Sequence, residues 1–273
     1  MTGAARKVVL VTGASAGIGR ATASLLGEHG WDVVAASRRG TAPQGAQALV
    51  MDVDDDGSVE QGVAGVLDRY GRMDAVVSCA GWGLGGAFET TPLDEARAQM
   101  ETNFWGTVRV ARAALPAMRS QGGGRLVWMS SIGGVLGLPF QGYYSASKFA
   151  LEGLAEAMAH ELAPLGVDVT LIEPGNVRTD FTERRRVLRD GGVYAKAMER
   201  AITVMERDEQ NGVDALKVAQ VVSRVLGSRR PPRRVSVGRA SERVGIVGKR
   251  VMPYRLFEAS ARGSLGVSRK PLV

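Results

Sequence analysis

Two hydrophobic periodicities alternate along most of the chain. Short runs rich in Val, Ile and Ala are typical of buried parallel strands, and longer segments with apolar residues three or four apart are typical of helices that cover a sheet. The runs that predict strands are Lys7–Val11, Asp32–Ser37, Ala46–Met51, Ala75–Ser78, Arg125–Ser130, Val167–Ile172 and Arg234–Val237. The segments that predict helices are Ile18–His29, Asp56–Tyr70, Leu93–Met118, Tyr143–Ala163 and Val213–Leu226.

This alternation of strands and helices predicts an α/β fold, a single-domain Rossmann-type doubly wound parallel sheet with helices on both faces. Residues 1–273 contain no obvious linker, so we expect one dinucleotide-binding and catalytic domain. The rhythm breaks after Pro174. Residues 177–205 are polar and Arg-rich and contain Gly191–Gly192, which predicts a mobile substrate lid without a fixed, packed helix. Residues 239–273 are expected to form a basic C-terminal extension.

Two of the predicted helices are long, rich in Ala and weakly charged on one face. They cover Asp94–Met118 and Gly142–Ala163. Helices of this kind often pack against a second subunit, so we expect a homodimer or homotetramer.

The chain carries a formal net charge of +7, and the excess is concentrated near its C-terminus. Arg229–Arg255 contains nine Lys or Arg residues and one Glu, a balance that could serve nucleic acid, an acidic membrane surface or an anionic cofactor. No zinc-ligand spacing or RNA-binding aromatic segment accompanies it, and two histidines cannot build a metal cluster. We therefore expect neither nucleic-acid binding nor a metal site.

Cysteine content and hydropathy bear on the cellular compartment. Cys79 is the single cysteine, which excludes an intrachain disulfide and fits a reducing compartment. The N-terminal segment is too short and too soon interrupted for a signal peptide. Leu126–Ser147 is uncharged over 22 residues, but its Ser, Gly, Pro and Gln residues favour a buried strand and loop over a membrane span. We expect a cytoplasmic protein with no transmembrane segment.

A glycine-rich segment, TGASAGIG at Thr12–Gly19, follows the first predicted strand and precedes the first predicted helix. At such a position backbone N–H groups and the helix dipole can hold a pyrophosphate. Gly13 suits the tight turn, Gly17 allows the backbone to approach the phosphates, and Gly19 permits close packing of helix and strand. Ser15 and Ile18 belong to the same loop. The alternative is a glycine-rich turn without a ligand.

The tip of the second predicted strand indicates which dinucleotide binds. A carboxylate there would hold the ribose hydroxyl of NAD, whereas a basic residue would accept the additional phosphate of NADP. The strand ends in Ser37, Arg38 and Arg39 with no acidic residue. A guanidinium presents a planar fork to phosphate oxygens, so NADP is favoured. Two solvated arginines are the alternative.

Tyr143 and Tyr144 precede Lys148, and only one of the tyrosines is four residues from it. On a helix, residues four apart share a face, so Tyr144 lies beside Lys148 while Tyr143 lies beside Ser147. This pairing by itself also fits the start of a helix with a solvated lysine.

These features, together with further motifs, resemble the short-chain dehydrogenase/reductase family over roughly residues 6–180. The motifs that match in order and spacing are TGASAGIG, Cys79–Gly81, Asn103, Ser131, Tyr144-x-x-x-Lys148 and Pro174–Gly175. The segment SSIGGVLGLPFQGYYSASKFALEGL also resembles the branch of hydroxysteroid and retinol dehydrogenases.

The resemblance implies roles for individual residues. Tyr144 matches the catalytic acid/base, Lys148 its partner, and Ser131 the serine that holds the substrate carbonyl. Asn103 matches the asparagine that continues a water relay from the lysine. The positions implied to contact the cofactor, beyond the glycine-rich loop and the strand tip, are Asp52, Val53, Ala80, Gly81, Asn103, Tyr144, Lys148, Pro174, Gly175, Val177 and Thr179.

One position departs from the family pattern. The family usually has Asn before Ala80–Gly81, and this chain has Cys79. The change puts a stabilising hydrogen bond of the central strand in doubt more than the chemistry. We expect a buried structural cysteine, with a reactive thiol as the alternative.

Acid–base chemistry selects Tyr144 as well. A free phenol has a pKa of about 10 and is a poor proton donor and acceptor at neutral pH. A nearby ammonium stabilises the phenolate, so we expect Lys148 to lower the pKa of Tyr144.

The expected function is an NADP-dependent oxidoreductase that interconverts a carbonyl and a secondary alcohol on a hydrophobic small molecule. A catalytically silent NADP-binding sensor or scaffold protein is the alternative from another class. An apolar substrate pocket is expected, although each of its residues could equally belong to the core. The candidate pocket residues are Trp82, Leu138, Phe140, Tyr143, Phe181 and Met198.

Overall fold

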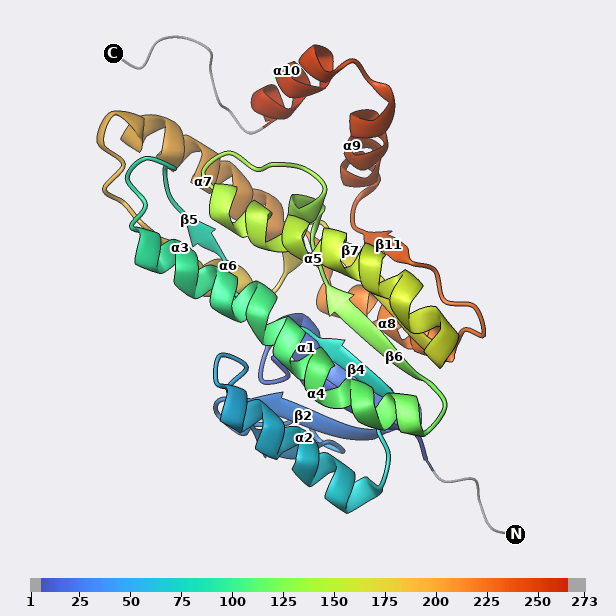
Figure 1. The fold of residues 1–273 in the computed structure, drawn as a ribbon. Helices are drawn as coiled ribbons and strands as arrows, with labels where there is room; N and C mark the ends of the chain where they lie inside the picture. The colour runs from blue at the N-terminus through green and yellow to red at the C-terminus, as the bar shows by residue number, and fades with distance from the viewer. Residues whose placement is uncertain (1–5, 265–273) are drawn as a thin grey trace.

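The computed structural model describes residues 6–264, which are built around one seven-stranded parallel sheet (Figure 1). The strand order across this sheet is β11-β7-β6-β4-β1-β2-β3. Its strands are β1 Val8–Thr12, β2 Asp32–Ser37, β3 Gln47–Val50, β4 Ala75–Ser78, β6 Gly124–Met129, β7 Val167–Pro174 and β11 Arg234–Val237. Two small sheets pair β5 Leu84–Gly85 with β9 Arg186–Val187 and β8 Val177–Arg178 with β10 Val213–Asp214.

Helices connect and cover these strands. The α-helices are α1 Gly17–Glu28, α2 Asp56–Tyr70, α3 Leu93–Met100, α4 Gly106–Ser120, α5 Gly142–Leu162, α6 Phe181–Arg184, α7 Ala195–Gln210, α8 Ala215–Gly227, α9 Ala240–Val251 and α10 Tyr254–Ser264. Short helical turns are η1 Glu101–Trp105, η2 Ile132–Gly134, η3 Ala163–Leu165 and η4 Gly192–Tyr194. The architecture is the doubly wound Rossmann-type fold that the sequence predicts.

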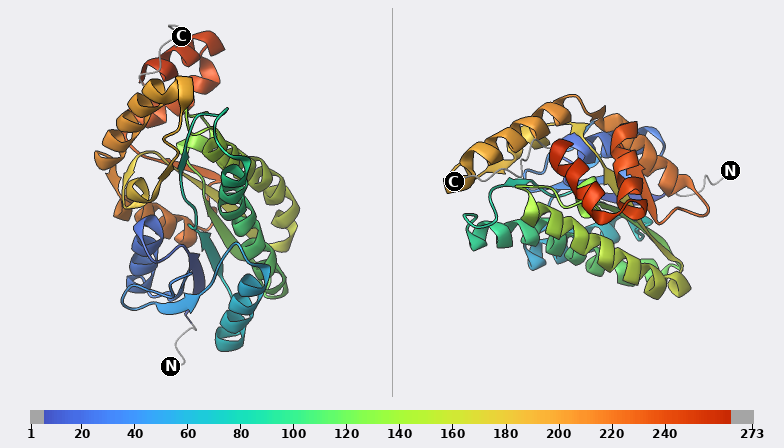
Figure 2. Two further views of the ribbon diagram at one scale, coloured as in Figure 1. Left: turned by 90° about the vertical axis from the view of Figure 1, so that its left-hand side faces the viewer. Right: turned by 90° about the horizontal axis from the view of Figure 1, so that it is seen from above.

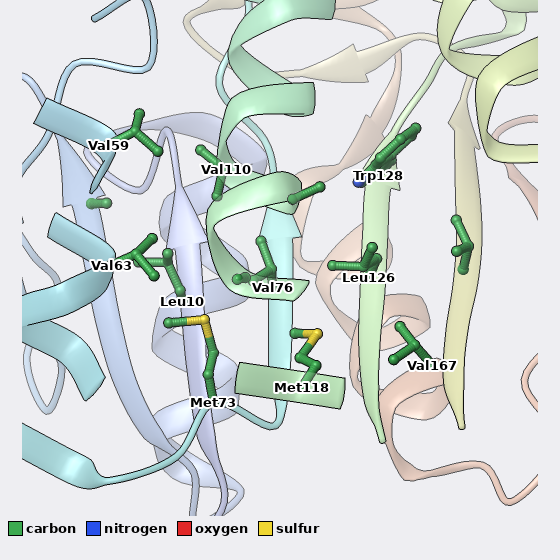
Figure 3. Close-up of a cluster of buried hydrophobic side chains, with 14 of the residues drawn as sticks. Leu10, Val59, Val63, Met73, Val76, Val110, Met118, Leu126, Trp128 and Val167 are labelled. Atoms are coloured by element: carbon green, nitrogen blue, oxygen red, sulfur yellow. The ribbon is translucent and has the colours of Figure 1, made fainter. Parts of the chain in front are cut away.

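Alternate residues of each strand serve the two faces of the sheet, as the twofold period of a strand requires. Leu10, Val76 and Leu126 point toward α4, where Val110 and Met118 meet them (Figure 3). Their strand neighbours, including Val9, Val77 and Val127, form a second core under α1 and α8. The sheet therefore lies between two layers of helices (Figure 2).

The strand order reverses between β1 and β4, which places a crevice at their carboxyl ends. Thr12 and Ser78 are paired in register at these ends, so the loops that follow them meet. The Ala80 amide donates to the Thr12 hydroxyl across the gap at 3.3 Å. Ligands of open α/β sheets bind in this kind of crevice.

Two predictions about helices are wrong. Leu93–Met118 is not one uninterrupted α-helix, because a π-helical turn at Glu101–Trp105 separates α3 from α4. Residues 177–205 were predicted to contain no packed helix. The structure contradicts this, because α7 begins at Ala195 and buries the apolar residues of one of its faces. Met198, Ile202 and Met205 form a small core there, and Lys196, Glu199 and Arg200 of the same helix are exposed.

The basic extension forms α9 and α10 as far as Ser264, and the rest of 239–273 lies outside the described residues. Glu242 in the first turn of α9 accepts from the Asn176 side chain at 2.8 Å and from the Arg239 amide at 2.8 Å. This carboxylate joins α9 to the loop after β7. Among residues 6–264, none of the helices is long and apolar enough to cross a membrane.

Candidate active site

A cavity of about 860 Å³ opens at the carboxyl ends of the central strands. Every cofactor-contact residue predicted from the sequence lines it, except Asn103. These are Gly13, Ser15, Gly17, Ile18, Gly19, Ser37, Arg38, Arg39, Asp52, Val53, Ala80, Gly81, Tyr144, Lys148, Pro174, Gly175, Val177 and Thr179. Residues from distant parts of the sequence meet here because parallel strands end at the same edge.

The glycine-rich loop forms one end of the cavity. Gly13 has a φ of 64°, and a Cβ atom there would lie 2.8 Å from the Ala80 amide nitrogen. A Cβ atom on Gly19 would collide with the Gly13 carbonyl oxygen. Helix α1 begins at Gly17, has no side-chain cap at Ala16 and no acidic residue in its first turn. Its first N–H groups therefore remain available for an anion, and this end fits a dinucleotide pyrophosphate.

Arg38 and Arg39 lie exposed beyond the tip of β2. Arg39 donates to the Ser15 hydroxyl at 3.0 Å, which fixes its guanidinium against the glycine-rich loop. Within the described part of the chain, neither arginine forms a salt bridge with a carboxylate. Their positive charge is thus free to meet a phosphate.

Asn103 lies in the π-helical turn and is completely buried, so it supports the cavity from behind. Its side-chain oxygen accepts from the Trp82 amide at 3.0 Å, and its nitrogen donates to the Trp82 carbonyl and to the Ser147 hydroxyl, both at 3.1 Å. The loop after β4 is therefore clamped to α5. A short π-helical turn within a longer helical segment, such as the one that contains Asn103, is frequent at functional sites.

Ser131, Tyr144 and Lys148 come together from β6 and α5 at the middle of the cavity. Ser131 follows β6 and accepts from the Gly133 amide at 3.0 Å. Tyr144 and Lys148 are one helical turn apart on α5, with the Lys148 nitrogen 5.9 Å from the Tyr144 ring centroid. The Lys148 ammonium donates to the Met129 carbonyl at 2.8 Å, which directs it beneath the cavity.

Burial controls the proton affinity of this group. It raises the pKa of Tyr144, and Glu209 acts in the same direction, whereas a hydrogen bond with Ser131 and the charge of Arg185 oppose the rise. Burial also lowers the pKa of Lys148 to about 8, and the neighbouring Cys79 and Glu152 side chains act to raise it. The predicted net lowering of the Tyr144 pKa is wrong for this structure, because desolvation of the phenolate outweighs the Ser131 hydrogen bond and the charge of Arg185.

Cys79 is partly buried at the carboxyl end of β4 and lines the cavity. Burial raises the pKa of its thiol to about 12, although the charge of Lys148 acts to lower it. The thiol therefore stays protonated at neutral pH, which fits an unreactive structural cysteine.

The predicted substrate residues divide into two groups. Trp82, Leu138 and Phe181 line the cavity, and Phe181 lies 6.1 Å from Tyr144 between ring centroids. Phe140, Tyr143 and Met198 do not line it. Tyr143 instead stacks on Phe88, with ring centroids 5.8 Å apart, because the helical turn points it away from Tyr144. Phe140 and Met198 pack together in the small core under α7.

Sequence reasoning missed an ion pair in the cavity wall. The Arg185 guanidinium binds the Glu209 carboxylate, which also accepts from Thr182. The Arg185 side chain is 0% exposed and that of Glu209 14%. Arg185 lies over Phe181, 5.7 Å from its ring centroid. Arg185 and Glu209 are 24 positions apart, with β9 and most of α7 between them, so no periodicity in the sequence could pair them.

Comparisons with known proteins agree with this geometry. A family model described as short chain dehydrogenase matches residues 7–188. A 3-ketodihydrosphingosine reductase of Bacteroides thetaiotaomicron is 38% identical over 94% of this chain and 97% of its own. Human 17-beta-hydroxysteroid dehydrogenase type 1 is 41% identical over 65% of this chain and 60% of its own. The crystal structure of a short-chain dehydrogenase from Streptomyces avermitilis, 35% identical, superposes with a TM-score of 0.82 over 94% of this chain and 98% of that one.

Proposed function

Because the chain belongs to the short-chain dehydrogenase family of oxidoreductases, we propose that it interconverts a carbonyl and a secondary alcohol on a hydrophobic small molecule with NADP(H). The observation that carries this proposal is the convergence of Ser131, Tyr144 and Lys148 in the cavity that the glycine-rich loop also lines. A silent sensor or scaffold protein would not require these three side chains at one place.

The roles assigned to the side chains are those that the family resemblance implies, and the place of the three side chains in one cavity supports them. Ser131 holds the substrate oxygen, and Tyr144 donates a proton to it during reduction. At neutral pH the phenol of Tyr144 carries the proton that it would donate, but its raised pKa makes it a weaker acid, so the phenolate that forms needs a cation beside it. Lys148, with a pKa of about 8, is mostly cationic at pH 7 and stabilises the phenolate as it forms. Asn103 holds the loop that carries Trp82 in position.

The nicotinamide cofactor, when bound, supplies the hydride. The glycine-rich loop and the start of α1 would hold its pyrophosphate, and Asp52 and Val53 would lie beside its adenine. Ala80 and Gly81 would line its path, and Pro174, Gly175, Val177 and Thr179 would close over the nicotinamide. This assignment is supported by the uncapped start of α1.

A hydrophobic substrate is supported by Trp82, Leu138 and Phe181 in the cavity wall. Two relatives named above are a 3-ketodihydrosphingosine reductase and a 17-beta-hydroxysteroid dehydrogenase. The ketones that correspond to these names are therefore the first substrates to test. The test follows NADPH oxidation by absorbance with 3-ketodihydrosphingosine, 17-ketosteroids and simple ketones. Failure of every ketone, together with failure of the matching alcohols and NADP, would contradict the proposed enzyme.

The preference for NADP is assigned to Arg38, with Arg39 and Ser37 assisting. Charge-assisted hydrogen bonds contribute about 1.5–3 kcal/mol, or about ten- to a hundredfold in affinity. We expect NADPH to bind at least about tenfold more tightly than NADH, and Arg38→Asp to shrink or invert this ratio. The dissociation constants of both cofactors for both proteins measure it. Equal affinities in the unmutated protein would leave the arginines as solvated surface charge.

We also propose a cytoplasmic homodimer or homotetramer in which α4 and α5 face a second subunit. The partly exposed aromatic side chains of Trp105 and Phe149, at 49% and 40%, support this surface. Sedimentation equilibrium measures the assembly, and a mass of one chain, 28.9 kDa, would refute it.

A further inference from the structure

Helices α9 and α10 carry apolar side chains on the surface that faces away from the protein. Val244, Val247 and Val251 are three and four residues apart, so they share one face of α9, and they are 68%, 57% and 74% exposed. Leu256 on α10 is 60% exposed. We name these four residues the apolar stripe.

The stripe reverses the usual pattern of a surface helix, in which the exposed side is polar. The opposite side of α9 is already occupied by contacts with the protein. Ile246 is buried, Glu242 binds the loop after β7, and Lys249 donates to the Val135 carbonyl. Helix α9 is therefore anchored in an orientation that leaves Val244, Val247 and Val251 in solvent.

The helices that carry the stripe have a net positive charge, although Arg239 and Arg262 pair with Glu242 and Glu258. Residues 239–264 contain six Lys or Arg residues and two Glu residues. Arg243 and Arg255 are exposed next to Val244 and Leu256. A helix with apolar residues on one side and basic residues beside them is typical of segments that lie in the interface of an anionic bilayer. A second copy of this chain would bring like charges together, so charge complementarity favours lipid.

We propose that α9 and α10 form a docking surface for an anionic lipid bilayer, with the apolar stripe inserted at the level of the headgroups. The placement suits a hydrophobic substrate. Glu242 ties α9 to Asn176, and Asn176 lines the cavity. Figure 1 shows both helices beyond the sheet. Helix α9 contacts α5 through Lys249, whose Nζ atom lies 4.8 Å from the Phe149 ring centroid. Binding of this kind is reversible and needs no membrane-spanning helix.

The test is co-sedimentation of the full-length protein with vesicles of phosphatidylcholine alone or mixed with phosphatidylglycerol. We expect binding to the mixed vesicles, weaker binding to phosphatidylcholine alone, and a decline with added salt because surface charge is screened. Val247→Glu/Val251→Glu should lower the partition coefficient about tenfold or more, since it removes apolar contact and adds negative charge.

The matched control is Leu165→Glu/Leu216→Glu, which changes net charge equally at two exposed positions outside the stripe, 38% and 46% exposed. It should bind vesicles nearly as well as the unmutated protein. Circular dichroism and cofactor affinity verify that both double variants remain folded. Vesicle co-sedimentation and circular dichroism do not measure turnover. The result of this test is therefore independent of whether the proposed reaction is correct.

Four results would overturn it. The unmutated protein could remain in the supernatant with anionic vesicles, or both double variants could lose binding equally. The stripe variant could also change the mass of the assembly in sedimentation velocity, which would assign the surface to a second copy. Retention on duplex DNA without vesicle binding would assign the charge to nucleic acid.

Discussion

Tyr143 and Tyr144 are adjacent in the sequence but lie in different surroundings. Tyr144 is buried at the cavity beside Ser131, and Tyr143 stacks on Phe88 outside it. Tyr144→Phe should therefore bind cofactor normally and lose turnover by about 10²–10⁴, the usual contribution of a general acid. Tyr143→Phe keeps its stacked ring and should change kcat little. Steady-state kinetics on both variants measure this, and a Tyr143→Phe enzyme without turnover would reverse the assignment.

The burial of Lys148 can be tested through the pH dependence of the free energy of unfolding. Its pKa in the folded protein, about 8, lies below the unfolded value of about 10.4, so the unfolded chain binds this proton more tightly. The free energy of unfolding should therefore rise with pH between about 8 and about 10.4. Lys148→Met lacks this contribution. The stability of the unmutated protein relative to Lys148→Met should increase between pH 7 and pH 10 in urea unfolding, and a constant difference would contradict the burial of an ammonium.

At the scale of elements, the segment after β7 is held by the Arg185–Glu209 ion pair, which links the end of α6 to α7. Nε and Nη1 of Arg185 have no hydrogen-bond partner among the described residues, so the pairing with Glu209 is the main compensation for its burial. Breaking the pair from one side leaves the other charge buried.

Arg185→Met should accordingly destabilise the protein by about 3–5 kcal/mol, the usual result of removing one partner of a buried pair. Arg185→Met/Glu209→Met removes both charges and should recover much of the loss. Arg207→Met is the control, because Arg207 is 65% exposed in its pair with Asp208 and should contribute little. Urea unfolding of the three variants measures these differences. A double variant as unstable as the single one would mean that shape, not charge, holds the segment.

At the scale of the whole molecule, residues 177–205 lie along the cavity and remain our proposed substrate lid. Val177, Thr179 and Phe181 line the cavity, and the segment meets the rest of the fold through short pairings of β8 with β10 and β9 with β5. Short pairings open at low free-energy cost, which a lid requires.

Limited proteolysis tests this closure. Cleavage should occur first within 177–194, between β8 and the start of α7, and should slow when NADPH and a substrate are both present. The buried residues Met198, Ile202 and Met205 of α7 should protect 195–205 from cleavage both with and without ligands. Equal cleavage rates with and without ligands would count against a lid.

The fold and the cavity residues that follow strand ends could be predicted from the amino-acid sequence. Buried parallel strands appear in a sequence as short apolar runs. The predicted bounds agree with the structure for three of them: Asp32–Ser37, Ala75–Ser78 and Arg234–Val237. Because parallel strands end together, the glycine-rich loop and Arg38 could be placed at one crevice. Periodicity predicted the strands and helices, whereas Ser131 and Tyr144 were assigned through motifs that resemble a known family.

Features that depend on contacts between distant residues could not be predicted in this way, because they arise only when the chain is folded. The π-helical turn that positions Asn103, the outward stacking of Tyr143 and the pairing of Arg185 with Glu209 are results of packing, and none has a signal in local periodicity. The raised pKa of Tyr144 belongs to the same class. Proximity of Lys148 in the sequence predicted a lowered value, but the free energy of a charge depends on how far the whole fold removes it from water.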